Sequence, residues 1–507
     1  MGSQVEEINQ HGAGSVLGID RHMQSLPGAS VVLPFKDLRR IGAASRVMVQ
    51  VAVGIMAVSP PGWTRTVALG FHRQKDSHLK ILRGRGGRIL SGIVALGGGT
   101  IGAQLVTLIA VPFISRSYTP AEFGVFALAS SLSSVLAPVL TLRLESAMLL
   151  PSSKRQTSAI FFLALASSVI LSVAASLVLG IMQLLGTLAS NGEYQGFPIW
   201  VGLISFLSAL FALVGQLALR QHRYGAVAQR SVTQSLVING TQVGLGFAGA
   251  TSVGLMAGAT FGRVVGIVPL FLASRSELSH FSKPDVLAML KEYWRFPTIF
   301  TLSGLLNAFG LQAPVLFAGL WFSASQVGQL GMAERILFIP ITVVGGAIAQ
   351  VLEAEVAERL RLQTGGILRV FLRLSTALAS VSLLLVILVM TLAQWAVPFL
   401  LGAKWQEASI LMTLLVIPVA TRLVASPMSR VLMSLQHGRI TLVLDVVRVA
   451  LILVAALVVS HFQIGFIWAM ATLYCGLGLT YVATWFVSLH VVRRSPLGAS
   501  SNPRPAS

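Results

Sequence analysis

Several charged side chains stand inside stretches of sequence that are otherwise apolar. Arg263 lies in the middle of one such stretch, and the adjacent Glu334 and Arg335 lie within another. Asp445 and Arg448 lie within a third. A charged group at the centre of a bilayer costs about 2.5–3.5 kcal/mol on insertion scales, so it marks a cavity or a buried pair. Arginine there offers the chemistry of anion binding, because its planar guanidinium donates paired hydrogen bonds to phosphate oxygens.

The spacing of the charges predicts which of them meet. Asp445 and Arg448 stand three residues apart, which places them on one helix face within reach of each other. Adjacent Glu334 and Arg335 point in different directions and should have different partners. Arg143 and Glu145 lie near the end of another apolar stretch. Two interpretations of these pairs stay open: a binding surface for an anionic group, or internal pairs that tie helices together.

Arg263 has no acidic residue in its own apolar stretch, so we favour binding there. Asn307, Gln312 and Gln104 could hydrogen-bond the hydroxyls of a ligand, or join helices at about 0.6 kcal/mol per bond. The candidate binding residues are Arg263, Arg335, Arg143, Arg448, Arg422, Asn307, Gln312 and Gln104. The candidate charge-pair or gating residues are Glu145, Glu334 and Asp445.

The elements that must position these residues are long apolar helices. Only 11% of the residues are charged, whereas 54% are hydrophobic. About 20 mostly apolar residues suffice for a helix to cross a bilayer. We therefore predict an all-α polytopic membrane protein with about twelve spans, at 89–114, 123–148, 159–184, 197–219, 227–248, 252–273, 296–321, 327–350, 371–394, 407–425, 440–460 and 464–490.

Lysine and arginine are concentrated in alternate connections between these spans. The segment before the first span and the loops after even-numbered spans are basic, whereas the loops after odd-numbered spans contain only Arg116 and Lys404. Cytoplasmic loops carry the excess of positive charge in membrane proteins. The pattern predicts cytoplasmic termini and supports the span count, because one missed helix would scramble it.

Other functions are disfavoured by composition and motifs. The net charge of +20 comes from basic residues in short loops, which indicates contact with anionic membrane lipids rather than nucleic acid. The single Cys475 lies inside a span and implies neither a disulfide nor a metal site. No phosphate-binding loop of the G-x-x-x-x-G-K-[ST] type and no zinc motif occurs. We expect no metal, cofactor, catalytic residue or enzymatic activity.

The two ends of the chain differ from its middle. Residues 1–88 are basic and poorly periodic, so we expect a disordered tail or a reading frame that begins upstream of the true start. Residues 495–507 are expected to form a disordered C-terminal tail. The run Val47–Val58 is too short to cross a bilayer.

The sequence repeats itself at half length. Phe123–Ala129 (FGVFALA) opens the second span, and Val327–Ala333 (VGQLGMA) opens the eighth. Two duplicated halves of six spans each would enter the membrane with the same orientation. We therefore predict two six-helix bundles, 89–274 and 275–494, that face each other across a central cavity. Rocking of the bundles would expose that cavity to alternate sides of the membrane.

Four segments carry a resemblance to a known family: Tyr118–Gly124 (YTPAEFG), Leu142–Pro151 (LRLESAMLLP), Tyr293–Pro297 (YWRFP) and Phe399–Trp405 (FLLGAKW). Over roughly residues 85–492 the chain resembles the polysaccharide transporters, or oligosaccharide flippases. These belong to the multidrug/oligosaccharidyl-lipid/polysaccharide exporter superfamily.

The resemblance implies a substrate and a location. Members of this family move undecaprenyl-diphosphate-linked sugar repeat units from the cytoplasmic to the periplasmic leaflet of the bacterial inner membrane, for surface polysaccharide biosynthesis. It also implies a polysaccharide polymerase and chain-length proteins as partners. The alternative is a drug or cation exporter of the same superfamily, driven by protons or sodium. Such an exporter would want unpaired carboxylates, whereas Glu145, Glu334 and Asp445 each have an arginine nearby.

Overall fold

The computed structural model describes residues 85–186, 194, 196–435 and 437–495, and every regular element among them is a helix. All the described residues belong to one compact unit, Gly84–Ser507. The expected N-terminal tail lies outside the described residues, apart from the last four residues of 1–88, which begin the first described helix. The expected C-terminal tail also lies outside them, apart from Ser495.

The described helices confirm a polytopic all-α membrane protein. Ten of them are long and apolar enough to cross a membrane, and a bent helix pair raises the count to eleven. Large apolar side chains cover the outer surface, for example Ile170 and Leu177 on one long helix and Leu384 on another. Lipid solvates such surfaces, whereas water would not favour them.

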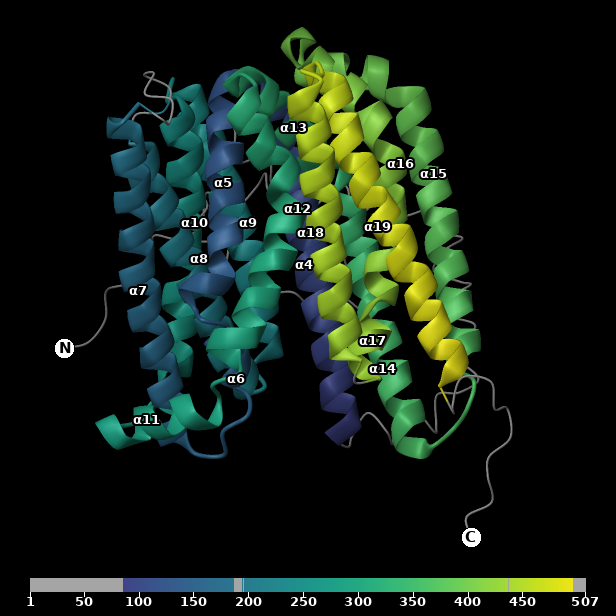
Figure 1. The fold of residues 1–507 in the computed structure, drawn as a ribbon. Helices are drawn as coiled ribbons and strands as arrows, with labels where there is room; N and C mark the ends of the chain where they lie inside the picture. Colours follow the sequence, from purple (N-terminus) through teal and green to yellow (C-terminus); the bar gives the residue numbers. More distant parts are fainter. Residues whose placement is uncertain (1–84, 187–193, 195, 436, 496–507) are drawn as a thin grey trace, which may run out of the picture. The chain divides into compact units, whose positions relative to one another are not determined.

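The first half of the described chain contributes six long helices (Figure 1). They are α4 (Arg85–Ser117), α5 (Pro120–Leu140), α7 (Lys154–Leu184), α8 (Phe197–Arg220), α9 (Tyr224–Phe247) and α10 (Ser252–Ser274). In this group α4 packs on α9, α9 on α10, α10 on α8, and α8 on both α7 and α5.

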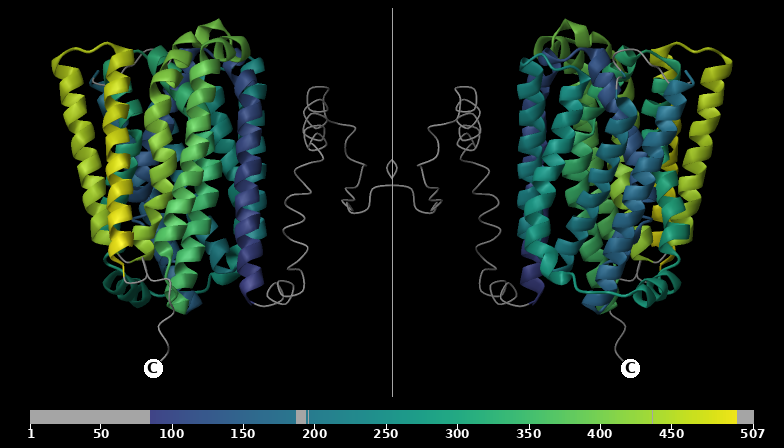
Figure 2. Two further views of the ribbon diagram at one scale, coloured as in Figure 1. Left: turned by 90° about the vertical axis from the view of Figure 1, so that its right-hand side faces the viewer. Right: turned by 90° about the vertical axis from the view of Figure 1, so that its left-hand side faces the viewer.

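The second half contributes helices that run alongside one another in the same way, as two side views show (Figure 2). They are α12 (Thr301–Trp321), α13 (Ala324–Leu337), α14 (Gly346–Leu362), α15 (Ile367–Leu401), α16 (Gln406–Met428), α18 (Gly438–His461) and α19 (Phe466–Arg494). Here α12 packs on α18, α18 on α19, α19 on α16, and α16 on both α15 and α13. The packing pattern of the first half thus recurs helix for helix.

Two of the expected spans differ from simple membrane helices. The fifth is helical as α9, but it is not apolar enough to count as a span, because it carries Arg230, Gln234, Asn239 and Gln242. The eighth is broken: α13 is followed by the π-helical turn η5 (Ile341–Gly345) and then α14, with a bend of 42°. Pro340 stands at the break, and its missing N–H explains the interruption.

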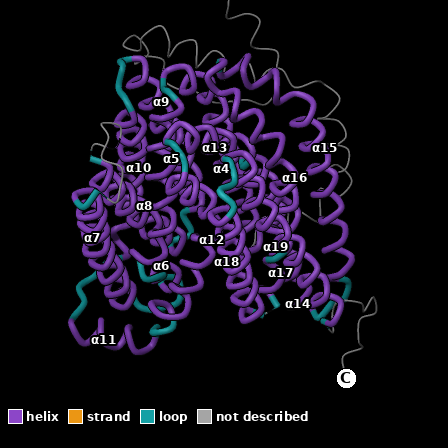
Figure 3. The backbone as a smooth tube through the Cα atoms, turned by 45° about the horizontal axis from the view of Figure 1, so that its top comes forward, coloured by secondary structure: helices purple, strands orange, loops and turns teal. Residues whose placement is uncertain are grey.

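Short elements connect the long helices, mostly at one end of the described unit (Figure 3). They are α6 (Leu144–Ala147), η3 (Arg275–Glu277), α11 (Lys283–Glu292), η4 (Phe296–Phe300), η6 (Ala403–Trp405) and α17 (Arg430–Ser434). We call the end at which α11 lies the α11 end, and the end at which α5 and α13 begin the α13 end. Both ends are visible in Figure 1.

Polar contacts fix α11 to its neighbours. The carboxylate of Asp285 accepts hydrogen bonds from the backbone N–H and the hydroxyl of Ser282, both at 2.7 Å, and so caps the helix. Arg155 at the start of α7 forms an ion pair with the same carboxylate at 3.2 Å. The bonds from Ser282, with the charge of Arg155, hold the pKa of Asp285 below its usual value.

Candidate functional site

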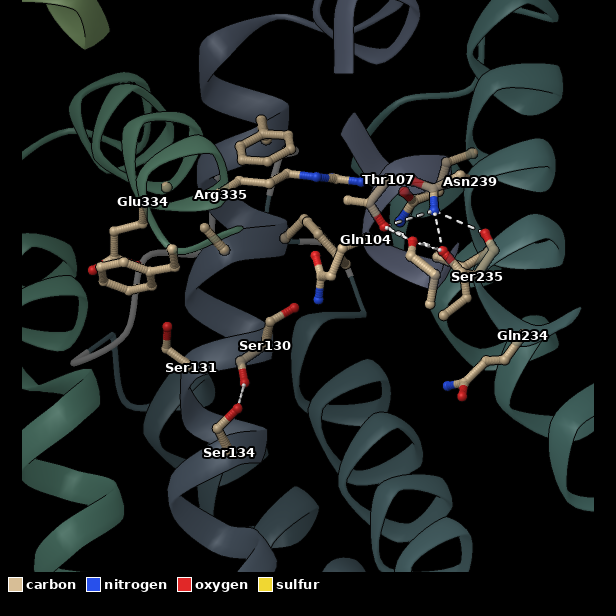
Figure 4. Close-up of a pocket in the computed structure, with 18 of the residues that line it drawn as sticks. Gln104, Thr107, Ser130, Ser131, Ser134, Gln234, Ser235, Asn239, Glu334 and Arg335 are labelled. Atoms are coloured by element: carbon tan, nitrogen blue, oxygen red, sulfur yellow. Dashed lines mark hydrogen bonds between the residues drawn. The ribbon is translucent and has the colours of Figure 1, made fainter. Parts of the chain in front are cut away.

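A chamber of about 560 Å³ lies between the two groups of helices. Four helices of the first half (α4, α5, α8 and α9) line it together with α12 and α13 of the second, as Figure 4 shows in part. Twelve of its 22 lining residues carry hydroxyl or amide side chains, among them Gln104, Thr107, Ser130 and Ser134. Apolar groups, including the rings of four phenylalanines, supply the larger part of its surface. Such a wall suits a polar ligand that carries many hydroxyl groups.

Arg335 crosses this chamber from the second half to the first. Its Nη2 donates to Oδ1 of Asn239 on α9 at 2.7 Å. Asn239 is held in turn, because its Nδ2 donates to the carbonyl of Ser235 at 2.8 Å and to Thr107 Oγ1 at 3.3 Å. Among the described residues Arg335 forms no ion pair. Its positive charge is therefore met by an amide oxygen and by the ring of Phe123, whose centre lies 5.8 Å from the guanidinium carbon.

Glu334 lines the same chamber but has a different partner, as its adjacent position predicts. The hydroxyl of Tyr474 on α19 donates a short hydrogen bond to Glu334 Oε1. Arg422 lies over the ring of Phe338, another lining residue, with 4.5 Å between its guanidinium carbon and the ring centre. Glu334 therefore faces the second half, whereas Arg335 reaches into the first.

Only some of the predicted site residues line the chamber. Arg335, Gln104, Gln312 and Glu334 do. The lining does not include Arg263, Arg143, Arg448, Arg422, Asn307, Glu145 or Asp445. Arg263 belongs to α10, and its side chain is partly buried. Its Nη1 donates to the carbonyl of Ala259, one turn earlier in the same helix, at 2.8 Å.

The predicted pairs form internal contacts. Arg448 Nη1 donates to Asp445 Oδ1 and to Asn307 Oδ1, both at 3.0 Å, and so ties α18 to α12. The side chains of Asp445 and Arg448 are each only 8% exposed. Arg143 Nη1 lies 3.5 Å from Glu145 Oε1, where the chain turns between α5 and α6. These contacts favour the interpretation of both pairs as ties between or within helices.

Sequence reasoning missed three features of the site. Tyr474 was not singled out, although it is the hydrogen-bond donor to Glu334. Arg230 was also overlooked: it stacks 3.6 Å over the ring of Phe211, a lining residue. Ser130 and Ser134 line the chamber from α5, and their spacing of four residues is the signal that could have found them.

The two halves meet tightly at the α13 end of the chamber. Gly124 of α5 and Gly328 of α13 bring their helices so close that a Cβ on either would overlap the facing backbone, at Ala324 or Pro120. Phe123 and Gly331, beside these glycines, line the chamber, so the contact lies just beyond its end.

Trp405 reinforces this contact. It is fully buried, and its Nε1 donates at 2.9 Å to the carbonyl of Ser115 near the end of α4. Gln329 of α13 donates to the carbonyl of Lys404 at 2.6 Å and so holds this loop in place. We call Gly124, Gly328, Gln329 and Trp405 the seal.

Tyr118 adds a further contact at the same end, within the first half. Its hydroxyl donates to the carbonyl of Gln242 at 2.8 Å. Burial, with a smaller effect of Glu122, raises the pKa of Tyr118 to about 12. The hydroxyl therefore keeps its proton and stays a donor at any physiological pH.

Comparison with known proteins gives one family and one fold. Residues 113–410 match the model of the family described as "Polysaccharide biosynthesis protein". None of the curated proteins compared with the chain matches it.

Solved structures of membrane transporters share the fold at low identity. The lipid II flippase MurJ, in an inward closed conformation, is 12% identical over 77% of this chain and 86% of its own, with a TM-score of 0.61. A mutant of the Vibrio cholerae MATE transporter VcmN is 13% identical over 82% of this chain and 98% of its own, with a TM-score of 0.53. A Pyrococcus furiosus transporter of the MOP superfamily is 15% identical over the same shares, with a TM-score of 0.52.

Proposed function

The chain belongs to the polysaccharide biosynthesis protein family, and from that premise we propose that it is a flippase for undecaprenyl-diphosphate-linked oligosaccharide repeat units. It moves them from the cytoplasmic to the periplasmic leaflet of the bacterial inner membrane, for surface polysaccharide biosynthesis. The head group occupies the chamber while the polyprenyl tail stays in lipid. A polysaccharide polymerase and chain-length proteins would use the product.

One observation carries this proposal: Arg335, which forms no ion pair among the described residues, stands in a chamber that many neutral hydroxyl and amide groups line. Arg335 gives only one of its hydrogen bonds to Asn239, and a guanidinium has five N–H donors. A phosphate oxygen can displace or join the amide, because a charge-assisted hydrogen bond is stronger than a neutral one. Hydroxyl and amide groups such as Ser134 and Gln104 face the sugar.

The same geometry suggests how the chamber opens. The two halves, 89–274 and 275–494, act as two bundles that rock about their shared boundary, with the α11 end toward the cytoplasm. The seal closes the chamber at the periplasmic end. No ATP hydrolysis is required: an inside-negative potential favours outward movement of an anion by about 2.3 kcal/mol per charge per 100 mV.

A second candidate is export of a drug or a cation, because MATE transporters are among the proteins with this fold. A cation exporter needs a carboxylate that can exchange a proton or sodium for its substrate. Two of the three carboxylates that we predicted as gating residues form ion pairs, Glu145 with Arg143 and Asp445 with Arg448. Glu334 forms no ion pair among the described residues and accepts a hydrogen bond from Tyr474. An anionic substrate fits this arrangement better.

The test replaces Arg335 with glutamine in cells that lack the native gene. The side chain keeps its polarity and loses its charge, and loss of a charged hydrogen bond weakens binding by roughly tenfold or more. We expect surface polysaccharide to fall accordingly while lipid-linked repeat units accumulate, measured by glycan staining and lipid extraction. The control is Arg373→Gln, because Arg373 lies exposed on α15, away from the chamber.

The outcomes separate the two candidates. Lost polysaccharide in Arg335→Gln, with normal polysaccharide in Arg373→Gln and equal amounts of both proteins in the membrane, supports the flippase. Unchanged polysaccharide in the gene deletion, together with new drug sensitivity, would favour the exporter instead.

A further inference from the structure

Two sets of polar side chains in the chamber wall differ in their hydrogen bonding. Thr107, Ser235 and Asn239 are hydrogen-bonded to one another, and Asn239 also accepts from Arg335. This set is committed to the protein itself. The second set consists of three glutamines, Gln104, Gln234 and Gln312, which line the same chamber.

The side-chain amides of these three glutamines form no hydrogen bond with the described residues, although most other polar side chains of the wall do. None of their amide atoms is fully buried without a partner, so the amide groups are accessible from the chamber. Figure 4 shows the amide ends of Gln104 and Gln234 directed into the space between the helices, away from the bonded cluster at Asn239. Each amide offers two donors and an acceptor oxygen.

The glutamines converge from three helices on one space. Gln104 belongs to α4, Gln234 to α9 and Gln312 to α12, so both halves of the molecule contribute. A polar side chain in a membrane protein ordinarily finds a protein partner, because the bilayer offers none. Three uncommitted amides around a single chamber therefore indicate a ligand with several hydrogen-bonding groups.

The charges nearby narrow the class of that ligand. The chamber is lined by one arginine and one carboxylate, Arg335 and Glu334. An acidic sugar would bring a second negative charge toward Glu334, with Arg335 already used by phosphate. Neutral amides are matched instead to uncharged hydroxyl groups, which both donate and accept.

We propose that Gln104, Gln234 and Gln312 form a subsite for uncharged sugar residues of the substrate. This inference rests on the proposed function, and adds to it that these three amides select uncharged sugar residues over acidic ones. Each glutamine donates to one sugar hydroxyl and accepts from another.

The experiment measures binding to the purified full chain in lipid nanodiscs. The probes are undecaprenyl diphosphate alone, the same lipid carrying a neutral trisaccharide, and the same lipid carrying a trisaccharide in which one hexose is a uronic acid. We expect the neutral glycolipid to bind most tightly. Each of the variants Gln104→Leu, Gln234→Leu and Gln312→Leu should weaken its binding by roughly five- to tenfold, since each loses one or two neutral hydrogen bonds.

Two controls show that such a loss is specific. The leucine variants should bind bare undecaprenyl diphosphate as the wild type does, which also shows that they are folded. Gln394→Leu removes an exposed glutamine of α15 that does not line the chamber, so it should bind all three probes normally. Glu334→Gln should reduce the preference for the neutral glycolipid over the uronate-bearing one.

The contrary results are distinct. If bare and sugar-bearing lipids bind alike, or the leucine variants weaken both equally, the glutamine subsite is wrong and the flippase proposal stands. If the uronate-bearing lipid binds as tightly as the neutral one, the restriction to uncharged sugars is wrong. If no lipid-linked probe binds at all, the proposed function itself fails.

Discussion

At the scale of single residues, the clearest contrast is between the buried ion pair of Asp445 with Arg448 and Arg335, which lies in the chamber without an ion pair among the described residues. Asp445 and Arg448 are each 8% exposed and share a hydrogen bond of 3.0 Å. Arg335 has an amide oxygen and an aromatic ring as partners, but no carboxylate of the described residues. Burial of an ion costs several kcal/mol unless a partner compensates it. We therefore assign the Asp445–Arg448 pair to stability and Arg335 to substrate binding.

This assignment predicts opposite behaviour on substitution. Arg448→Met leaves the Asp445 carboxylate buried and uncompensated, which should destabilise the protein by roughly 3–5 kcal/mol. The double variant Asp445→Asn with Arg448→Met should recover most of that loss. The measurement is the temperature of unfolding in detergent. Equal stability of Arg448→Met and the wild type would contradict the structural role of the pair.

The sequence predicted these contacts unevenly. The spacing of Asp445 and Arg448 was enough to predict their contact, because i and i+3 lie on one helix face. The role of Arg263 could not be settled that way, because the direction of a side chain relative to a cavity depends on how distant helices pack. The role of Gln234 cannot be predicted from the sequence for the same reason: an amide that hydrogen-bonds another helix and an amide that faces a cavity look alike in a sequence.

At the scale of the elements, the alternating access that we propose depends on the seal. Gly124 and Gly328 allow two helix backbones to touch, and Trp405 covers the contact from the loop before α16. Small residues at helix crossings permit such approach. One added methyl group would disrupt this contact, because a Cβ on Gly328 would overlap the carbonyl of Pro120.

We predict that Gly328→Ala opens the chamber toward the periplasm. Overpacking a tight contact costs about 1–3 kcal/mol, enough to shift a two-state equilibrium by roughly tenfold. The measurement is the labelling rate of Ser130→Cys in a Cys475→Ser background, with a membrane-impermeant thiol reagent added outside intact cells. The control is Gly180→Ala, because no atom lies within 4 Å of a Cβ there. An unchanged rate in Gly328→Ala would show that this contact does not gate the chamber.

The membrane helices could be predicted where the sequence is uniformly apolar. They were harder to predict where polar residues line the chamber. The long helices such as α7 and α15 follow directly from their composition. α9 is too polar to pass as a membrane span because Gln234, Asn239 and Gln242 face the chamber. The bend between α13 and α14 has a local signal in Pro340, but proline inside membrane helices is too common to predict a 42° bend.

At the scale of the whole molecule, the two halves use the same pattern of helix packing. The order in which α4, α5, α7, α8, α9 and α10 contact one another is repeated by α12, α13, α15, α16, α18 and α19. This recurrence supports the proposed duplication, which the short matches in sequence suggested. The fold class could be predicted because solvation by lipid leaves few solutions for an apolar chain. A central cavity could be predicted from the duplication as well, but its lining could be predicted only in part, because side chains from both halves form it.

The central claim is that this protein carries a lipid-linked oligosaccharide through that chamber, and movement of the lipid between leaflets tests it most directly. Purified protein is reconstituted in vesicles that contain an undecaprenyl-diphosphate-linked neutral oligosaccharide, and a lectin that cannot cross the membrane reports the glycan on the outer surface. We predict that the wild type renders the inner-leaflet pool accessible over time, and that Arg335→Gln slows this by roughly tenfold or more. Accessibility that never exceeds that of protein-free vesicles, or equal rates for both proteins, would contradict the account.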